Sequence, residues 1–230
     1  METYHKINAL FKRYTDGKKK GKLILGDWAV PEFEYLAKNQ WEYTEKVDGT
    51  NIRVRFGYPG EDGYLVVFKG RSDNATIPTP LLGHLNDTFT PGLFRDAGFE
   101  EDSPVTLFGE GYGPKIQNGG NYRDDVSFVL FDVKIGDWWL SRKDVDDIAA
   151  KLGIDSVPTI GYGTLQDAID IVSSGITFTD TGAIKRWGRG GLKSQWGDFE
   201  AEGIVARPVV PLFNRKGERI ITKIKAVDFK

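Results

Sequence analysis

The chain has 230 residues, 40% of them hydrophobic and 28% charged, so it is globular and long enough to bury a sizeable core. It has no cysteine, which excludes disulfides and thiolate chemistry, and its two histidines argue against a zinc site, so any metal should be a hard cation on oxygen ligands. The net charge of −2 excludes a bulk polycation, and no segment is long enough to span a membrane or patterned as a signal peptide; we therefore expect a cytoplasmic protein that contacts no membrane.

The N-terminal part of the chain gives mixed signals. Residues 4–11 are apolar but too few to decide between helix and strand, and residues 12–22 predict a basic loop. Residues 27–39 predict a short helix, because Pro31 suits a first turn and Phe33, Leu36 and Ala37 would share one face.

Three central strands are predicted, over residues 44–46, 51–56 and 64–69. In the second strand Ile52, Val54 and Phe56 alternate with polar residues, which is the period of a half-buried strand. A turn over residues 57–63 should join the second strand to the third.

Lys46 lies between the first two of these strands. Asp48 and Gly49 form a turn signal, because Gly49 can adopt a positive φ without steric cost. Lys46 is therefore expected at the mouth of a strand-turn-strand, a place from which an amine could react. The alternative is a plain hairpin that carries a solvated lysine.

The rest of the chain predicts an α+β domain built on antiparallel sheets with flanking helices. A polar connection and weak helical signals precede three strands, over residues 105–109, 127–133 and 138–140, the first two separated by a glycine-rich segment. Ser141 and Thr164 each precede an amphipathic helix and have an aspartate three residues on, as in a capping box. Strands return over residues 203–207 and 219–227.

Two basic stretches could contact nucleic acid. One comprises Lys12, Arg13 and the lysines of residues 18–22, and the other runs from Lys185 to Lys193 with Trp187 inside it. Cations mixed with tryptophan in a glycine-rich loop suit backbone contact and base stacking. Each stretch could equally be a solvated loop.

Several segments carry residues suited to nucleotide chemistry. Glu110 is expected at the end of an apolar strand, where a carboxylate can bind sugar hydroxyls or a hydrated cation, and Phe131 could stack on a base or fill the core. In residues 202–207, strand alternation separates Glu202 from Val205 and Arg207, unless Gly203 introduces a bulge.

Lys223 and Lys225 are two residues apart, so on a strand both ammonium groups point to one side and could bind a phosphate. A free lysine amine has a pKa near 10.4 and attacks phosphorus poorly. Neighbouring cations or a hydrated metal ion favour the neutral amine, and Lys223, Lys225 and magnesium would supply that charge beside an attacking lysine.

The ordered motifs Lys-x-Asp-Gly, Gly-Glu, Phe-Asp, Glu-Gly-Ile-Val and Lys-x-Lys resemble those of the covalent nucleotidyltransferases, the ATP-dependent RNA and DNA ligases and the mRNA capping enzymes. The resemblance covers the chain from Glu45 to Lys225. It is closest to the RNA ligases, because the first motif ends in Asn51 where DNA ligases typically carry arginine. The Gly-Glu motif also opens into an RNA-ligase-like stretch that ends in Ile116 and Gln117.

The resemblance implies a role for each matching residue. Lys46 would attack the α-phosphate of ATP, with Lys223 and Lys225 on that phosphate. Mg²⁺ or Mn²⁺ would be held by Glu202 and Glu110. The nucleotide would be bound by the remaining residues of the motifs and their neighbours, which are Glu45, Val47, Asn51, Arg71, Glu110, Phe131, Glu202 and Val205. Arg71 and Arg207 would also contact the RNA.

The implied reaction moves AMP from ATP to Lys46, then to an RNA 5′-phosphate, and finally joins that end to a 3′-hydroxyl. Residues 1–230 are expected to form one nucleotidyltransferase domain of ATP-grasp-like adenylylation type, without a separate C-terminal OB-fold or helical domain. No obligate protein partner is evident, and a phage or bacterial source is the expectation. The alternatives are a DNA ligase, a capping-type enzyme, or a non-catalytic module that binds RNA ends.

Overall fold

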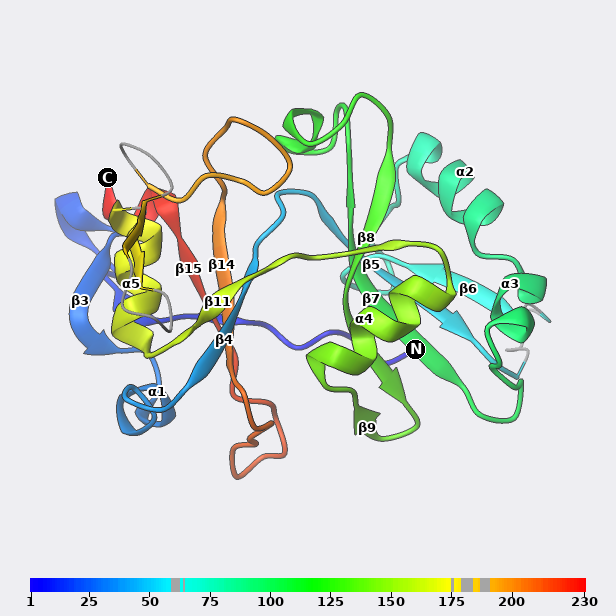
Figure 1. The fold of residues 1–230 in the computed structure, drawn as a ribbon, viewed down its shortest axis with the longest axis horizontal. Helices are drawn as coiled ribbons and strands as arrows, with labels where there is room; N and C mark the ends of the chain where they lie inside the picture. The colour runs from blue at the N-terminus through cyan, green and yellow to red at the C-terminus, as the bar shows by residue number, and fades with distance from the viewer. Residues whose placement is uncertain (59–62, 64, 175, 179–183, 187–190) are drawn as a thin grey trace. The chain divides into compact units, whose positions relative to one another are not determined.

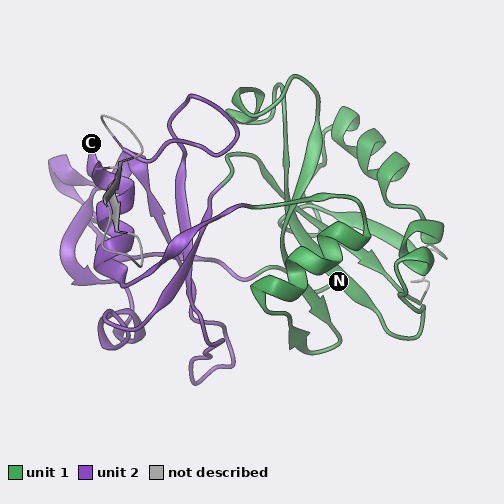
Figure 2. Cartoon of the chain, in the orientation of Figure 1, with its two compact units in different colours: residues 1–4, 47–157 green, residues 5–46, 158–230 purple. Residues whose placement is uncertain are grey.

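The computed structural model describes the chain except residues 59–62, 64, 175, 179–183 and 187–190 (Figure 1). The chain divides into two compact units. Unit 1 comprises residues 1–4 and 47–157, and unit 2 comprises residues 5–46 and 158–230 (Figure 2). Each unit has its own sheet and its own hydrophobic core.

Unit 1 is built on a six-stranded sheet in the order β10-β8-β7-β5-β6, with β9 beside β8. The pairs are antiparallel except for β10 with β8, which is parallel. The strands are β5 (Thr50–Phe56), β6 (Val66–Lys69), β7 (Val105–Tyr112), β8 (Ser127–Ile135), β9 (Trp138–Trp139) and β10 (Asp155–Ser156).

Helices α2 (Thr79–Thr88), α3 (Pro91–Asp96) and α4 (Arg142–Lys151) contribute to the core of unit 1 with Leu81, Phe94 and Val145 respectively. The sheet contributes its apolar alternation, including Ile52 and Val54. Helix α4 begins as predicted, because Ser141 Oγ accepts the Asp144 N–H. A short 3₁₀ turn, η2 (Gly119–Asn121), follows β7.

The polar side of β5 carries Arg53, which is fully buried. Its guanidinium donates to the backbone oxygens of Gly70 (2.8 Å), Met1 (3.2 Å) and Glu2 (2.9 Å), and to Asp73 Oδ1 (2.8 Å). Five donors in a fixed fork suit this many acceptors, and a lysine would not. Arg53 thus fixes the N-terminal residues to unit 1, a role that no local pattern in the chain predicts.

Unit 2 is built on a five-stranded sheet in the order β1-β15-β14-β4-β11. Only β1 with β15 is parallel in this sheet. The strands are β1 (Asn8–Ala9), β4 (Trp41–Glu45), β11 (Thr159–Gly163), β14 (Gly203–Pro208) and β15 (Thr222–Lys225). Two separate hairpins pair β2 (Phe11–Arg13) with β3 (Leu23–Trp28) and β12 (Ile176–Phe178) with β13 (Ile184–Arg186).

The core of unit 2 lies between this sheet and helices α1 (Pro31–Tyr35) and α5 (Leu165–Ser174). Trp41 and Tyr43 of β4 are fully buried in it, together with Leu165 of α5. The predicted capping box is present at α5, because Thr164 Oγ1 accepts the Asp167 N–H and Asp167 Oδ2 accepts the Thr164 N–H. Two 3₁₀ turns, η1 (Gly17–Lys19) and η3 (Ala226–Phe229), complete the unit.

The predicted fold class is confirmed as α+β on largely antiparallel sheets, and Lys46 lies between two strands as predicted, directly after β4 and before β5. The alternative of a plain hairpin is wrong. Strands β4 and β5 belong to different sheets, so no hairpin joins them. Gly49 does not have a positive φ. Glycine is required there because a Cβ would lie 2.3 Å from the Gly111 backbone oxygen.

Several boundaries differ from the predictions. Of the strand predicted over residues 219–227, β15 covers only Thr222–Lys225, because η3 begins at Ala226. Asp27 and Trp28 end strand β3, and α1 begins only at Pro31. Lys12 and Arg13 lie in β2 rather than in a loop, because that strand pairs with β3. Strand β7 extends beyond the predicted end at Gly109 into the glycine-rich segment as far as Tyr112, since its backbone stays paired to β5 and β8. Among the described residues, no helix is long and apolar enough to cross a membrane.

Candidate active site

Lys46 directly follows β4, and its backbone N–H donates to the Gly203 oxygen at 2.9 Å, which continues the pairing of β4 with β14. In the neighbouring register Thr44 pairs with Val205, and Val205 pairs with Lys223. Trp41, Tyr43 and Glu45 alternate with these positions, so Lys46 belongs to the face opposite the helical core. The burial pattern of β15 confirms that Lys223 and Lys225 share one side of their strand.

The centre of this face is Glu202, whose carboxylate is bound by two lysines. Lys46 Nζ lies 2.5 Å from Glu202 Oε2, and Lys225 Nζ lies 2.5 Å from Glu202 Oε1. The Glu202 side chain is only 14% exposed. Two ammonium groups against one carboxylate leave a net charge of about +1, with Lys223 nearby on β15, so the cluster can attract a further anion.

Gly203 explains how Glu202 reaches the two lysines. Its φ is +149°, and a Cβ at this position would lie 2.0 Å from the Ile224 backbone oxygen. Strand alternation alone would put Glu202 on the side away from Val205 and Arg207. Glu202 precedes β14, which begins at Gly203 and shows no register shift, so strand alternation does not extend to Glu202 and its side chain reaches Lys46 and Lys225.

Glu45 precedes Lys46 and lies in the interior of unit 2, with 1% of its surface exposed. Its Oε2 accepts the Gln195 N–H at 2.8 Å, and the Ser194 side chain also bonds to the carboxyl. Burial raises the pKa of the Glu45 carboxyl, and these hydrogen bonds oppose the rise. Glu45 Oε1 is buried without a partner among the described residues.

The dipeptide Glu45-Lys46 therefore holds both ends of the segment of residues 194–202. Glu45 binds Ser194 and Gln195 at its start, and Lys46 binds Glu202 at its end. Sequence reasoning missed Ser194 and Gln195, because nothing in the local pattern marks a loop that closes on a buried acid.

Arg207, predicted to contact RNA, lies opposite Glu42 in the β14–β4 register. Its Nη2 donates to Glu42 Oε1 at 3.1 Å, and both side chains are largely buried. An RNA contact by Arg207 would therefore compete with this ion pair.

The predicted residues of unit 1 centre on β5 and β7, where Asn51 and Glu110 are direct cross-strand partners. Asn51 Oδ1 is buried with no partner in the described part of the chain. Both positions lie on the polar side of the sheet, because Ile52 and Val54 face the core. Val47 is buried at 3% exposure, and Arg71 is exposed in the loop after β6.

Phe131 is the extra residue of a β-bulge. In the β7–β8 register Phe108 pairs with Asp132 and Gly109 pairs with Leu130, so Phe131 has no partner across the strand. The bulge puts Phe131 and Asp132 on the same side, away from the core residue Leu130. Phe131 is partly exposed and lies outside the buried core of unit 1.

Tyr4 packs against this bulge, a contact that no sequence motif signals. Its ring lies edge-on to Phe131 with 5.1 Å between centroids, and its hydroxyl donates to Asp132 Oδ2 at 2.8 Å. Phe108 and Trp139 complete an aromatic cluster around it.

The arrangement of acidic residues limits how a metal ion could bind. The described part of the chain holds no group of three or more histidine or acidic side chains that could enclose a metal ion. Mg²⁺ commonly uses one or two carboxylates with waters and substrate phosphates, so the single Glu202 carboxylate fits such an ion.

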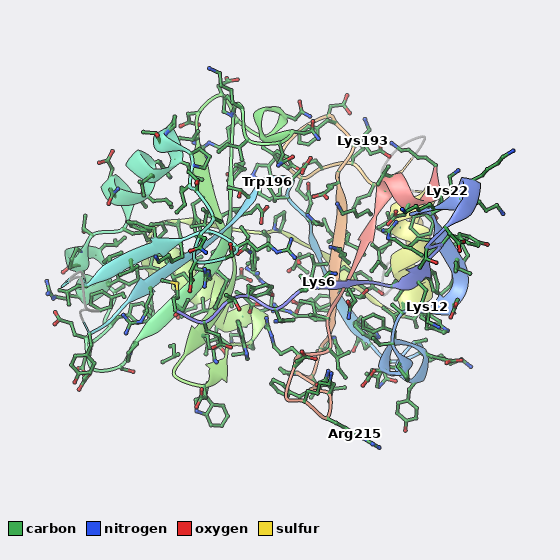
Figure 3. All side chains as sticks on the ribbon, turned by 180° about the vertical axis from the view of Figure 1, so that it is seen from behind. Lys6, Lys12, Lys22, Lys193, Trp196 and Arg215 are labelled. Atoms are coloured by element: carbon green, nitrogen blue, oxygen red, sulfur yellow. The ribbon has the colours of Figure 1, made fainter. Side chains whose placement is uncertain are left out.

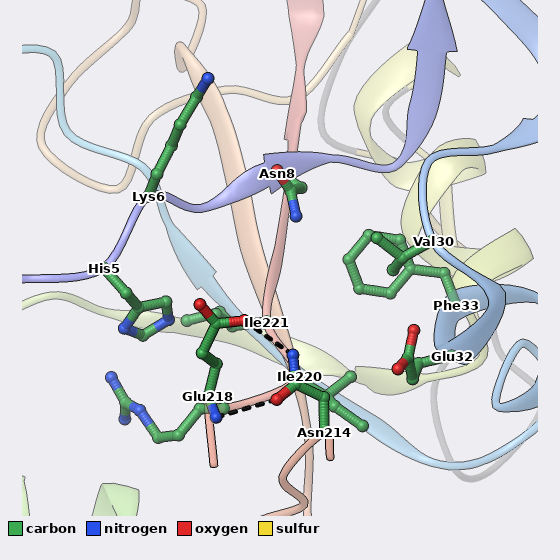
Figure 4. A pocket seen from close by; sticks show the side chains of 11 residues that line it. His5, Lys6, Asn8, Val30, Glu32, Phe33, Asn214, Glu218, Ile220 and Ile221 are labelled. Atoms are coloured by element: carbon green, nitrogen blue, oxygen red, sulfur yellow. Dashed lines mark hydrogen bonds between the residues drawn. The ribbon is translucent and has the colours of Figure 1, made fainter. Parts of the chain in front are cut away.

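A pocket of about 230 Å³ lies elsewhere in unit 2. Its lining includes the cations Lys6 and Arg219 and the acids Glu32 and Glu218, but none of the predicted site residues. Figure 4 shows Asn214 bonded to Glu218 on one side of it, with Lys6 extending away. Of the second basic stretch, Trp187 to Arg189 lie outside the described residues, and Lys193 is paired with Asp198 at 2.7 Å.

The fold is similar to that of solved RNA ligase structures. A lysine-to-alanine mutant of the Naegleria gruberi RNA ligase with ATP and Mn aligns at a TM-score of 0.60 and 13% identity, covering 97% of this chain and 60% of that one. The same ligase with PPi aligns at 0.59 and 15%, covering 85% and 52%. A lysine-to-methionine mutant with AMP and Mn aligns at 0.57 and 14%, with the same coverage. The chain thus spans between half and 60% of the length of these ligases.

The family model of the RNA ligases matches residues 39–225, which is most of the chain. The protein belongs to the RNA ligase family, and the resemblance read from its motifs is confirmed. No curated protein matches the sequence.

Proposed function

We propose that the protein is an ATP-dependent RNA ligase that forms a covalent lysyl-AMP at Lys46. The observation that carries the proposal is the Glu202 carboxylate held at 2.5 Å by both Lys46 and Lys225. A binding module needs no lysine paired in this way, whereas a nucleophile beside a positively charged anion site suits phosphoryl chemistry. Family membership and the solved ligase structures with ATP, AMP and PPi support it.

In the first step the Lys46 amine attacks the α-phosphorus of ATP. A P–N bond forms, the bond to pyrophosphate breaks, and the amine gives up a proton. The ion pair with Glu202 must open for this attack, since a protonated amine has no free electron pair. Lys225 and Lys223 would stabilise the charge on the α-phosphate. A divalent ion bound at Glu202 would supply further positive charge next to that phosphate.

In the second step an oxygen of the RNA 5′-phosphate displaces Lys46 from AMP, which regenerates the amine and forms a phosphoanhydride. In the third step the 3′-hydroxyl attacks the 5′-phosphorus, and AMP leaves. In both steps the protein would hold the attacking oxygen in line with the phosphorus and the leaving group, because positioning is the dominant requirement in phosphoryl transfer.

The motif order assigns the nucleotide base and ribose to unit 1. We propose that Glu110 binds the ribose and that Phe131 stacks on adenine. The bulge supports the role of Phe131, because it presents the ring outside the core. The unpartnered Asn51 oxygen beside Glu110 supports a polar ligand there. Val205 as the second adenine contact, Glu45 and Val47 as nucleotide contacts, and Arg71 and Arg207 as RNA contacts remain proposals from the motifs.

The test is the intact mass of the protein after incubation with ATP and Mg²⁺. We expect a mass increase of one AMP in the wild type and none in Lys46→Ala. Glu202→Gln should slow adduct formation by roughly 10²-fold, since it removes a charged group from the reacting centre. Glu200→Gln is the matched control, because Glu200 pairs with Lys230 instead, and it should retain the wild-type rate.

The same assay separates the alternatives. Labelling by GTP alone would indicate a capping-type enzyme, and sealing confined to DNA strands would indicate a DNA ligase. A protein that binds RNA but forms no nucleotide adduct under any condition would be the non-catalytic module that binds RNA ends.

A further inference from the structure

The hairpin formed by β2 and β3 carries four lysines that the proposed chemistry does not use. Lys18, Lys19, Lys20 and Lys22 all lie in its connecting loop, and all are exposed. Asp16 is the only acid of the loop, so residues 16–22 carry four positive charges and one negative charge, a net +3. In a protein of net charge −2, this is a local concentration of positive charge.

These lysines differ from Lys12 at the base of the same hairpin. Lys12 pairs with Asp27 at 2.7 Å. Within the described residues, none of the four loop lysines forms an ion pair with an acid; Lys19 instead lies over the Tyr14 ring, 5.5 Å from its centroid. Like charges in close sequence repel one another, and a polyanion that neutralises them removes that cost.

Backbone hydrogen bonds hold the loop that carries these lysines in one conformation. Its ends are joined by hydrogen bonds from the Tyr14 N–H to the Lys22 oxygen (3.0 Å) and from the Gly21 N–H to the Tyr14 oxygen (2.9 Å). Between them η1 closes a single turn, with the Lys20 N–H on the Gly17 oxygen at 3.2 Å. A partner therefore orders little backbone when it binds, which lowers the entropic cost of association.

The hairpin is fixed to the segment that follows the catalytic lysines. Arg13 at its base donates to both carboxylate oxygens of Asp228, at 2.8 and 2.7 Å. Asp228 lies in η3, which begins directly after Lys225. The loop is thus held within unit 2 by a bidentate ion pair, and Figure 3 shows Lys12 and Lys22 on this hairpin.

We propose that the loop of residues 14–22 binds the phosphate backbone of the RNA substrate through Lys18, Lys19, Lys20 and Lys22. The assignment rests on the proposed function. Lysine on a rigid turn is suited to phosphates as a point charge and carries no base specificity, so the contact should be independent of sequence. Tyr14, whose ring lies under Lys19, would place an aromatic side chain next to the bound RNA backbone.

The experiment compares the full-length wild type with a variant in which all four loop lysines are changed to glutamine. Binding of a short 5′-phosphorylated single-stranded RNA is measured by fluorescence anisotropy over a range of salt concentrations. The logarithm of the association constant falls as the logarithm of the salt concentration rises. Each lost phosphate contact makes this slope shallower by about 0.7, so the four substitutions should reduce its magnitude by up to about 3. Lysyl-AMP formation from ATP and the melting temperature should stay at wild-type values.

The matched control removes the same number of charges elsewhere, at the exposed residues Lys38, Lys143, Arg215 and Lys216. An unchanged salt slope in the loop variant, or an equal loss in the control, overturns the proposal while leaving the ligase assignment intact. A wild type that binds RNA but forms no lysyl-AMP would overturn the proposed function instead. Loss of lysyl-AMP together with a lowered melting temperature in the loop variant would assign the loop a structural role and also overturn the proposal.

Discussion

At the scale of single residues, the neighbours Glu45 and Lys46 have opposite environments. Lys46 joins Glu202 on the polar face, whereas Glu45 is enclosed with Ser194 and Gln195. A carboxyl buried with one oxygen unpartnered is costly when ionised. The position of Lys46 thus depends in part on the buried carboxyl of Glu45, which is held by Ser194 and Gln195.

The pH dependence of stability tests this environment. A carboxyl with a raised pKa in the folded state gains a proton on folding, so its stabilising contribution is complete below the unfolded pKa of about 4.3. It is lost as the pH rises through the folded-state pKa. Glu45→Gln resembles the protonated form, so its melting temperature relative to wild type should rise as the pH increases from about 4 through the folded-state pKa of Glu45.

Each kcal/mol gained by Glu45→Gln should raise the melting temperature by about 2–4 °C in a chain of this size. Glu200→Gln is the control, because its side chain is more exposed and pairs with Lys230; its difference from wild type should show no such rise with pH. A melting-temperature difference for Glu45→Gln that is flat or shrinks with rising pH would contradict the assignment of a buried, weakly compensated charge.

At the scale of elements, the site depends on where β14 starts. Gly203 pairs with Lys225 on one side and accepts the Lys46 N–H on the other. Its missing side chain allows three segments to meet, and its φ sends Glu202 toward the lysines. The strand boundary therefore sets the geometry of the ion-pair cluster.

Gly203→Ala should damage both stability and activity. A Cβ would lie 2.0 Å from a backbone oxygen in a strained conformation, so we expect a loss of about 2–4 kcal/mol in the free energy of unfolding. Lysyl-AMP formation should fall at least tenfold, because Glu202 and Lys46 would separate. Chemical denaturation and the mass assay measure the two effects.

Gly161→Ala is the control in the same sheet. It lies in β11 with no positive φ, and an added Cβ would have no atom within 4 Å, so its effect on stability should stay within about 0.5 kcal/mol. Equal stability of the two variants would show that β14 and β15 can separate without cost.

Elements with a local signal were predicted well from the sequence. The caps of α4 and α5 depend on residues three apart, and the apolar alternation of β5 depends on its own side chains. Register and pairing depend on distant partners, so the sequence did not show that β4 and β5 belong to different sheets, and the burial of Arg53 was not predicted. The ordered motifs identified Lys46, Glu202 and Lys225, but only the fold shows that Glu202 joins the two lysines.

At the scale of the whole molecule, unit 1 is almost a continuous insertion into unit 2. The chain leaves unit 2 after Lys46 and returns at Pro158. These points are close together, because the Glu45 N–H donates to the Pro158 oxygen at 3.0 Å and β4 pairs with β11. The core and sheet of unit 2 therefore close without residues 47–157.

Replacing residues 47–157 with a short glycine-serine linker should leave a folded unit 2. We expect a cooperative thermal transition by circular dichroism, since its core residues all lie outside the replaced segment. The AMP adduct should be undetectable, because Glu110 and Phe131 are absent. A chain without a cooperative transition would show that unit 2 needs unit 1 in order to fold.

The proximity of Glu45 and Pro158 also has a genetic consequence. One continuous stretch of the chain, residues 47–157, forms nearly all of unit 1, and it leaves and rejoins unit 2 at neighbouring ends of the paired strands β4 and β11. Crossovers at these two points would exchange the segment that carries Asn51, Glu110 and Phe131, while Lys46, Glu202 and Lys225 stay with the recipient. The residues proposed to bind the base and ribose would then be inherited separately from the lysines proposed to react, and only Met1–Tyr4 of the original unit 1 would stay with the recipient.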